Sequence, residues 1–165
     1  MSAARKPLPP REAPVHRWRE ALSDERIAHL VKLAFRETSR ALQDRLAPHG
    51  VLYGHWTLLR VLWQTDGLTQ RQLAEQASVS EPSAFTALRQ MEGLGYVKRQ
   101  KLAGNLKQVR VFLTPKGAAL RGASVGAAEE VNRLALAGVA KEDLEAARRV
   151  LVAILENLER EAAAG

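Results

Sequence analysis

The sequence of 165 residues contains no cysteine and no long apolar run. Without cysteine there is no disulfide, no thiolate redox sensor and no zinc site with sulfur ligands. No apolar stretch approaches the roughly 20 residues that a membrane-spanning helix needs, and the N-terminus lacks the apolar segment of a secretory signal. We therefore expect a cytoplasmic protein that does not enter a membrane.

Signatures of catalysis and of metal binding are also missing. The four histidines, His16, His29, His49 and His55, show no metal-ligand spacing, and no phosphate-binding glycine loop is present. No nucleophile stands in a recognisable pattern with a base. The sequence thus predicts no catalytic residue, no metal site and no cofactor.

The charge that is present is unevenly distributed. The net charge is +7, and residues 66–117 contain eight basic and four acidic residues, whereas residues 118–165 contain six basic and eight acidic ones. A local excess of positive charge favours a polyanionic partner. From charge alone, a basic surface that only keeps the protein in solution is an equally valid interpretation.

The chain begins with a proline-rich segment and two predicted helices. Residues 1–21 hold four of the seven prolines and several arginines, which is typical of a flexible basic arm. Apolar residues at helical spacing predict a long helix within residues 22–50, with Ser23 as its cap. The next helix, "LYGHWTLLRVLWQ", is apolar on most sides and should therefore be central.

Two shorter helices follow. Thr69 and Gln72 form a capping-box pattern, which predicts a helix that starts at Gln70. A second helix begins at Ser80 or Glu81 and ends near a glycine. Two short helices joined by a tight turn form a helix-turn-helix, whose second helix enters the major groove of DNA. The outward residues of this second helix are small and mostly uncharged, as close approach to base edges requires.

A basic hairpin is expected next. The segments "YVKRQKL" and "QVRVFLT" are typical of strands, and "AGNLK" between them is predicted to be the turn, with Gly104 and Asn105. Thr114 and Pro115 then begin another helix as cap and first residue. A basic hairpin after a helix-turn-helix defines a winged helix. We therefore expect a mainly α fold with a small β-hairpin wing (α+β), made of a winged helix-turn-helix lobe and a helical dimerisation lobe.

This order of elements, together with the motifs "LTQRQLAEQASVSEPSAFTALRQMEGLGYVKR" and "VRVFLTPKG", resembles the MarR family of bacterial transcriptional regulators over residues 27–158. The resemblance implies that the helix at residues 81–94 lies in the major groove and that the wing reaches the minor groove. The wing of this family usually carries an Asp-x-Arg motif, where this sequence has Asn105, Leu106 and Lys107. Lys107 keeps a cation at the position of the arginine, but Asn105 replaces the aspartate that would form an ion pair with it.

Pattern and resemblance together assign DNA contacts to the two short helices and to the wing. In the helix-turn-helix the expected residues are Thr69, Gln70, Arg71, Ser80, Pro82, Ser83, Ala84, Thr86, Ala87, Arg89 and Gln90. In the hairpin they are Lys98, Arg99, Lys101, Asn105, Lys107 and Arg110.

The C-terminal helix is expected to form the dimer that the resemblance implies. Apolar residues at alternating spacings of three and four are typical of a coiled-coil seam, and here they are Leu144, Ala147, Leu151, Ile154 and Leu158. The alternative is a helix packed within a monomer.

The family resemblance further implies an effector, a small aromatic or phenolic acid held near the junction of the two lobes. The candidate residues for it are Arg36, Arg40, Tyr53, His55 and Trp56. An alternative assigns Trp56 to the core and gives His55 a packing or capping role.

The sequence thus predicts a homodimeric regulator that binds double-stranded DNA at an inverted repeat, most simply a repressor released by its effector. Residues 1–21 form the arm, residues 22–50 and 118–165 the dimerisation region, and residues 51–117 the DNA-binding region. The alternatives are a winged helix that docks on proteins, and a non-specific DNA-binding protein without ligand control.

Overall fold

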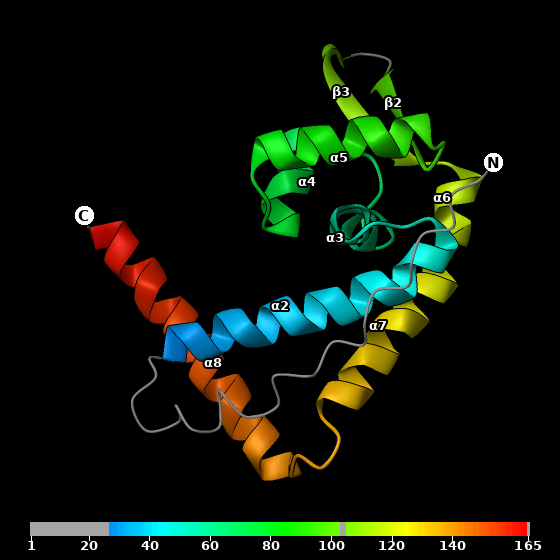
Figure 1. Ribbon diagram of the computed structural model, residues 1–165. Helices are drawn as coiled ribbons and strands as arrows, with labels where there is room; N and C mark the ends of the chain where they lie inside the picture. Colours follow the sequence, from blue (N-terminus) through cyan, green and yellow to red (C-terminus); the bar gives the residue numbers. More distant parts are fainter. Residues whose placement is uncertain (1–26, 103–104, 165) are drawn as a thin grey trace, which may run out of the picture. The chain divides into compact units, whose positions relative to one another are not determined.

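A computed structural model describes residues 27–102 and 105–164, with side chains except those of residues 102 and 105–108. The chain divides into two compact units, residues 1–37 and 38–165. Helices dominate, accompanied by one small sheet (Figure 1). The elements are α2 (Ile27–Leu46), the 3-10 turn η1 (Ala47–His49), α3 (Tyr53–Leu62), β1 (Leu68–Thr69), α4 (Gln70–Ala77), α5 (Glu81–Gly93), β2 (Val97–Leu102), β3 (Asn105–Leu113), α6 (Pro115–Ala119), α7 (Arg121–Ala135) and α8 (Lys141–Ala164).

The expected fold class, mainly α with a small hairpin, is confirmed. The predicted starts of α4, α5 and α6 also agree with the structure, because Thr69, Ser80 and Thr114 each cap the following helix with their side chain. The proposed arm and the proposed cap Ser23 lie outside the described residues. Among the helices that the structure does describe, none is both long and apolar enough to cross a membrane.

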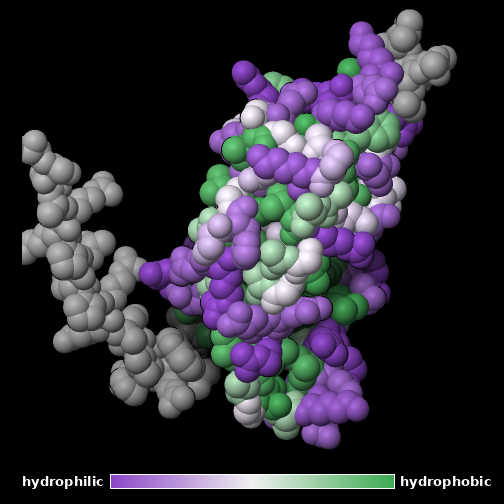
Figure 2. Space-filling view, turned by 90° about the vertical axis from the view of Figure 1, so that its right-hand side faces the viewer, coloured by the Kyte–Doolittle hydropathy of each residue, from purple (hydrophilic) through white to green (hydrophobic). Residues whose placement is uncertain are grey.

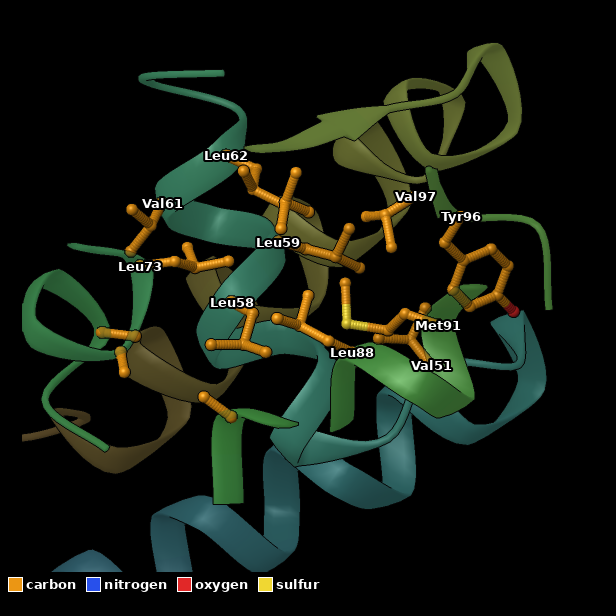
Figure 3. Close-up of a cluster of buried hydrophobic side chains, with 14 of the residues drawn as sticks. Val51, Leu58, Leu59, Val61, Leu62, Leu73, Leu88, Met91, Tyr96 and Val97 are labelled. Atoms are coloured by element: carbon orange, nitrogen blue, oxygen red, sulfur yellow. The ribbon is translucent and has the colours of Figure 1, made fainter. Parts of the chain in front are cut away.

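Helix α3 supplies the centre of the core. Leu58, Leu59 and Leu62 are almost completely buried, as the apolar character of this segment predicts (Figure 3). Each such side chain contributes about 1.5–3 kcal/mol to folding through the removal of apolar surface from water. The residues that pack around α3 come from α4 and α5 and from the sheet, and include Leu73, Leu88, Met91, Val97 and Val111.

The motif "LTPKG" joins the sheet to α6 through a close backbone contact. A Cβ atom at Gly117 would lie 2.0 Å from the carbonyl oxygen of Tyr96, so only glycine fits there. The Trp63 indole donates a hydrogen bond to the Gly117 carbonyl oxygen at 3.0 Å, which ties the end of α3 to the same point. The glycine is therefore required by the packing of α6 against Tyr96, the residue before β2, and its carbonyl also holds the end of α3.

The sheet differs from the expected hairpin in two respects. It has a third strand, β1, and the strand order is β1-β3-β2, all antiparallel. A strand of two residues is too short for an alternating pattern, so the sequence did not indicate it. The turn is also shorter than predicted: Leu102 pairs with Asn105, and residues 105–107 belong to β3 rather than to the turn.

Candidate nucleic-acid interface

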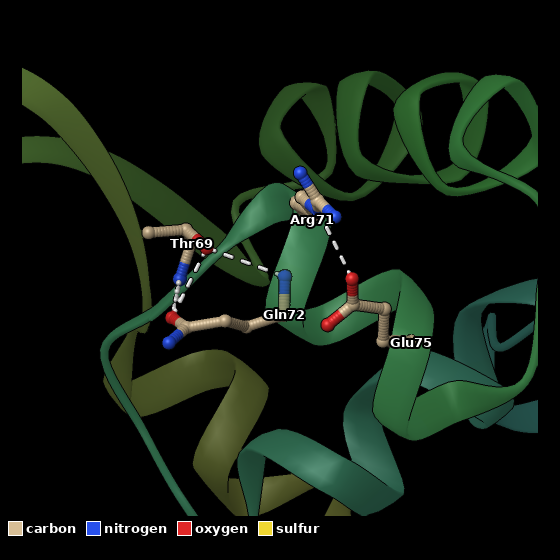
Figure 4. A network of polar contacts seen from close by, with 4 residues as sticks. All are labelled: Thr69, Arg71, Gln72 and Glu75. Carbon is tan, nitrogen blue, oxygen red and sulfur yellow. Dashed lines mark hydrogen bonds and ion pairs between the residues drawn. The ribbon is translucent and has the colours of Figure 1, made fainter.

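The first helix of the helix-turn-helix, α4, begins with a complete capping box (Figure 4). The Thr69 hydroxyl accepts from the Gln72 N–H at 3.2 Å, and the Thr69 N–H donates to the Gln72 side-chain oxygen at 3.0 Å. Two of the four N–H groups that lack a helical partner at this end are thereby satisfied. Arg71 is exposed but pairs with Glu75 at 2.9 Å, so a phosphate has to compete with that carboxylate for the guanidinium.

A tight turn leads from α4 into α5. Ser78 adopts a left-handed backbone conformation with φ of 54°, and it ends α4 as its C-cap. Ser80 then caps α5 by accepting from the Ser83 N–H at 3.3 Å, with Pro82 in the first turn. Since proline lacks an N–H, it fits a position where that group has no helical partner. The turn therefore fixes where α5 starts.

Helix α5 has one buried and one exposed face. Leu88 and Met91 are buried, while Pro82, Ser83, Thr86 and Arg89 are exposed. The prediction for Ala84 was wrong, because this residue is fully buried. Ala87, also assigned to DNA, is half-buried and packs against the core. Both follow from the helical period of 3.6, which brings positions 84, 87, 88 and 91 to the inner side.

Gln90 is connected to the core rather than directed only outward. The Leu52 N–H donates to Nδ1 of the buried His55 at 3.3 Å, so that nitrogen carries no proton. The proton is therefore on Nε2, which donates to Oε1 of Gln90 at 3.1 Å. A glutamine that specifies adenine uses its oxygen and its nitrogen together. The hydrogen bond from His55 occupies one of the two lone pairs of the Gln90 oxygen and so restricts how this side chain can be oriented toward a base.

A second polar cluster joins α5 to β2. Arg99 is partly buried, with its Nε atom 3.4 Å from Oε2 of Glu92. Its guanidinium also lies over the ring of Phe85, 5.6 Å from the ring centroid, and Arg89 lies at 5.9 Å from the same ring. Arg99 thus helps to fix β2 on α5. Sequence reasoning missed Phe85, although its spacing of four residues from Arg89 places both on one helix face.

The hairpin offers fewer free cations than the sequence predicts. Lys98 and Lys101 are exposed on β2, whereas the Arg110 guanidinium donates to the Gly67 carbonyl oxygen at 2.8 Å and so supports the base of the wing. The hairpin surface is largely hydrophilic (Figure 2, top). The side chains of Asn105 and Lys107 lie outside those that the structure describes.

The residues assigned to an effector have different environments. Both ring nitrogens of His55 are engaged by the protein, and Trp56 packs against the core and Trp63, with ring centroids 5.8 Å apart. His55 thus caps α3, because it accepts from the backbone N–H of the N-cap residue Leu52. Tyr53 is half-buried at the start of α3 and Arg40 is exposed on α2. Arg36, in the unit of residues 1–37, pairs with Glu37 at 2.8 Å.

The residues of the proposed seam on α8 are exposed or half-buried in the part of the chain that the structure describes. No residue of α8 is buried, and Leu151 and Leu158 are 43% and 64% exposed. Leu144 and Ile154 are half-buried, and Ala147 is exposed. The neighbouring Val150 and Leu155 are 51% and 62% exposed. An apolar stripe on a helix of 24 residues, none of them fully buried, is typical of a surface that packs against a partner.

The arrangement of α3, α4, α5 and the three-stranded sheet is a winged helix-turn-helix. Comparisons with known proteins agree with this class. The model of the MarR family matches residues 53–109. The HTH-type transcriptional regulator TtmR of Methylorubrum extorquens is 29% identical over 99 residues, which cover 60% of this chain and 51% of that protein. The chain thus matches about half the length of this relative.

Solved structures share the fold. A putative MarR family regulator from Listeria monocytogenes, solved with a 26mer DNA, superposes with a TM-score of 0.74 at 19% identity, covering 83% of this chain and 91% of that one. A Mycobacterium tuberculosis MarR family protein in complex with salicylic acid gives a TM-score of 0.63 at 24% identity, covering 81% of this chain and 98% of that one. Residues 53–109 of this chain thus match the MarR family model, and the chain shares its fold with solved MarR family regulators.

The buried His55 makes stability depend on pH. Burial lowers the pKa of His55 below its ordinary value of 6.5, and the hydrogen bond to Gln90 offsets this only in part. The unfolded chain therefore binds a proton at higher pH than the folded protein does. We expect the free energy of unfolding to fall as the pH drops through about 6.5, and to stop falling below the folded pKa. Urea unfolding at a series of pH values measures this.

The matched variants are His55→Gln and His49→Gln. The first removes the buried ring and should flatten the pH dependence between pH 5 and 7, roughly the range in which histidine titrates. The second removes an exposed histidine and should leave the pH dependence as in the wild type. Equal pH profiles for wild type and His55→Gln would show that this ring is not the group responsible.

Proposed function

We propose that the protein is a sequence-specific DNA-binding transcriptional regulator, most simply a repressor, that acts as a homodimer without a catalytic role. The observation that carries the proposal is the outward face of α5. Between Glu81 and Glu92 the helix has no acidic residue, and its exposed side chains include Ser83, Thr86 and Arg89. This face lies beside the exposed cations of β2, as a helix in the major groove next to phosphates requires.

The domain assignment is part of the proposal. Residues 51–117 bind DNA, residues 22–50 and 118–165 dimerise, and residues 1–21 add a basic arm. A regulator of this kind works where the chromosome lies, which we infer to be the cytoplasm. In support, a relative of similar fold was solved with a 26mer DNA. A docking module for proteins and a non-specific DNA-binding protein remain the competing functions.

Selection of bound sequences from a random DNA pool tests the proposal. A two-fold symmetric dimer should enrich an inverted repeat whose half-sites lie about 10 bp apart. Arg89→Ala should weaken binding to that operator by about 5- to 150-fold, the factor that corresponds to one two-point hydrogen-bonded pair with guanine. Arg133→Ala, on the exposed side of α7, is the control and should bind as the wild type does.

The salt dependence of DNA binding distinguishes phosphate contacts by the wing from base contacts by α5. Lys101→Ala should weaken binding to all sequences alike, and should reduce the slope of log K against log salt by about one if the lysine neutralises one phosphate. If selection enriched no sequence, non-specific binding or protein docking would replace the proposed function. If both variants bound the operator like the wild type, the assignment of these faces would be wrong.

Dimerisation through α8 is tested with a charge in the seam. Leu151→Arg should lower both dimer content and the free energy of unfolding, because the apolar stripe would have to bury a cation. Glu156→Arg places the same side chain on the polar side of the helix and should leave the dimer intact. Light scattering gives the oligomeric state directly. A fully dimeric and equally stable Leu151→Arg protein would put the interface elsewhere.

We further propose release from DNA by a small aromatic or phenolic acid. In support, one relative of the same fold was solved with salicylic acid. Arg40 supplies an exposed cation for the carboxylate, and Tyr53 an aromatic ring. The acid weakens DNA binding only if it binds better to a conformation in which the two α5 helices do not fit successive major grooves.

Titration of salicylate and other benzoate or cinnamate derivatives against labelled operator tests the effector. At least one acid should release the DNA from the wild type, and Arg40→Gln should need several-fold more of it while binding DNA normally. Arg60→Gln, an exposed arginine on α3, is the matched control. Unchanged DNA binding with every acid would remove the effector from the proposal but leave DNA binding in place.

A further inference from the structure

The outward face of α5 carries one large apolar side chain that the proposed function does not explain. Phe85 is 42% exposed. Single exposed apolar residues are common on protein surfaces and need no special role. Phe85 differs from such residues because it stands between positions 82 and 89 of the proposed DNA-binding face, and because its ring is held in place.

Two guanidinium groups hold the ring. The Arg99 Cζ atom lies 5.6 Å and the Arg89 Cζ atom 5.9 Å from the ring centroid, within the range of a cation–π interaction. Arg99 is itself anchored by Glu92 and is only 25% exposed. Its Nε and Nη2 atoms are buried without a hydrogen-bond partner, so Glu92 holds the guanidinium by charge, as an ion pair, while the guanidinium lies against the ring. The ring is therefore fixed at the surface of α5.

We propose that Phe85 contacts the C5-methyl group of a thymine and thereby selects thymine at one position in each half-site. The inference rests on the proposed function, in which α5 lies in the major groove. The thymine methyl is an apolar group on the edges of the base pairs that face the major groove, and phenylalanine is one of the side chains that can contact it. The other features of the groove are hydrogen-bond donors and acceptors, to which a phenyl ring offers nothing.

The neighbouring arginine restricts where the thymine lies. Arg89 carries the guanidinium that can bind guanine O6 and N7, and it is 5.9 Å from the Phe85 ring. This distance is less than two base-pair rises of about 3.4 Å. The selected thymine should therefore lie within two base pairs of the guanine that Arg89 contacts.

Deoxyuridine replaces thymine without changing its hydrogen bonds and removes only the methyl group. Each thymine of the selected operator is replaced in turn, and binding is measured by fluorescence anisotropy. One position per half-site should weaken wild-type binding about fourfold, the factor that corresponds to one buried methyl group. Phe85→Ala should bind the thymine operator more weakly and should show no further weakening with deoxyuridine at that position.

Two further variants serve as controls. Phe85→Leu keeps an apolar side chain and should retain part of the methyl discrimination. Leu94→Ala removes another exposed apolar residue, 42% exposed and just beyond the end of α5, and should retain all of it. The wild type alone shows whether a methyl group matters, and Phe85→Leu tests whether Phe85 contacts it if Phe85→Ala does not fold.

Three results would overturn the inference. The first is a selected operator that has no thymine near the guanine that Arg89 binds. The second is that the wild type binds every deoxyuridine operator as tightly as the thymine operator. The third is that deoxyuridine weakens binding equally in the wild type and in Phe85→Ala. Each leaves sequence-specific binding intact and so spares the proposed function. A selection that enriched no sequence would instead overturn the proposed function and this inference together.

Discussion

Helix α5 is buried along one face and exposed along the other, and the rest of the winged helix-turn-helix depends on this arrangement. Its inner face is buried against the core that surrounds α3, with Ala84, Leu88 and Met91 fully covered. Its outer face has to stay open. A small residue at position 84 lets the helix approach closely, and the helical period then leaves Ser83, Thr86 and Arg89 outside. The apolar α3 supplies the surface that makes this arrangement stable.

Polar contacts then fix the positions of individual side chains that apolar packing alone does not determine. His55 bonds to Gln90 of α5, Arg99 pairs with Glu92, and Arg110 donates to the backbone at Gly67. Two cations of the basic segment thus stabilise the fold as well as contributing charge. A count of lysines and arginines therefore overstates how many side chains are free to meet phosphates. Arg89, Lys98 and Lys101 are exposed, and so are Arg71, which pairs with Glu75, and Lys116, which donates to the Leu94 carbonyl oxygen.

The long C-terminal helix α8 differs from α5, because most of its apolar side chains are exposed rather than buried against the core. It has an apolar stripe but no buried residue, and among the described residues nothing covers this stripe fully, so the pattern favours a partner. In the proposed dimer the stripe is covered by a second copy, and the same contact sets the distance between two α5 helices. In that case one contact would determine both the stability of the dimer and the spacing of its α5 helices. A ligand that shifts the dimer geometry would therefore change the DNA affinity.

The sequence by itself determined the features whose causes lie within a few residues. Thr69 with Gln72, Ser80 with Ser83, and Thr114 with Gly117 are capping contacts over three positions, so the starts of α4, α5 and α6 could be predicted. The stripe of α8 is equally local. Tertiary structure decided which residues at these elements remain exposed. The bond from His55 to Gln90 spans 35 positions and that from Arg110 to Gly67 spans 43. The pairing of the two-residue β1 is likewise a distant contact. Such contacts form only when packing brings separate elements together, and no periodicity along the chain encodes them.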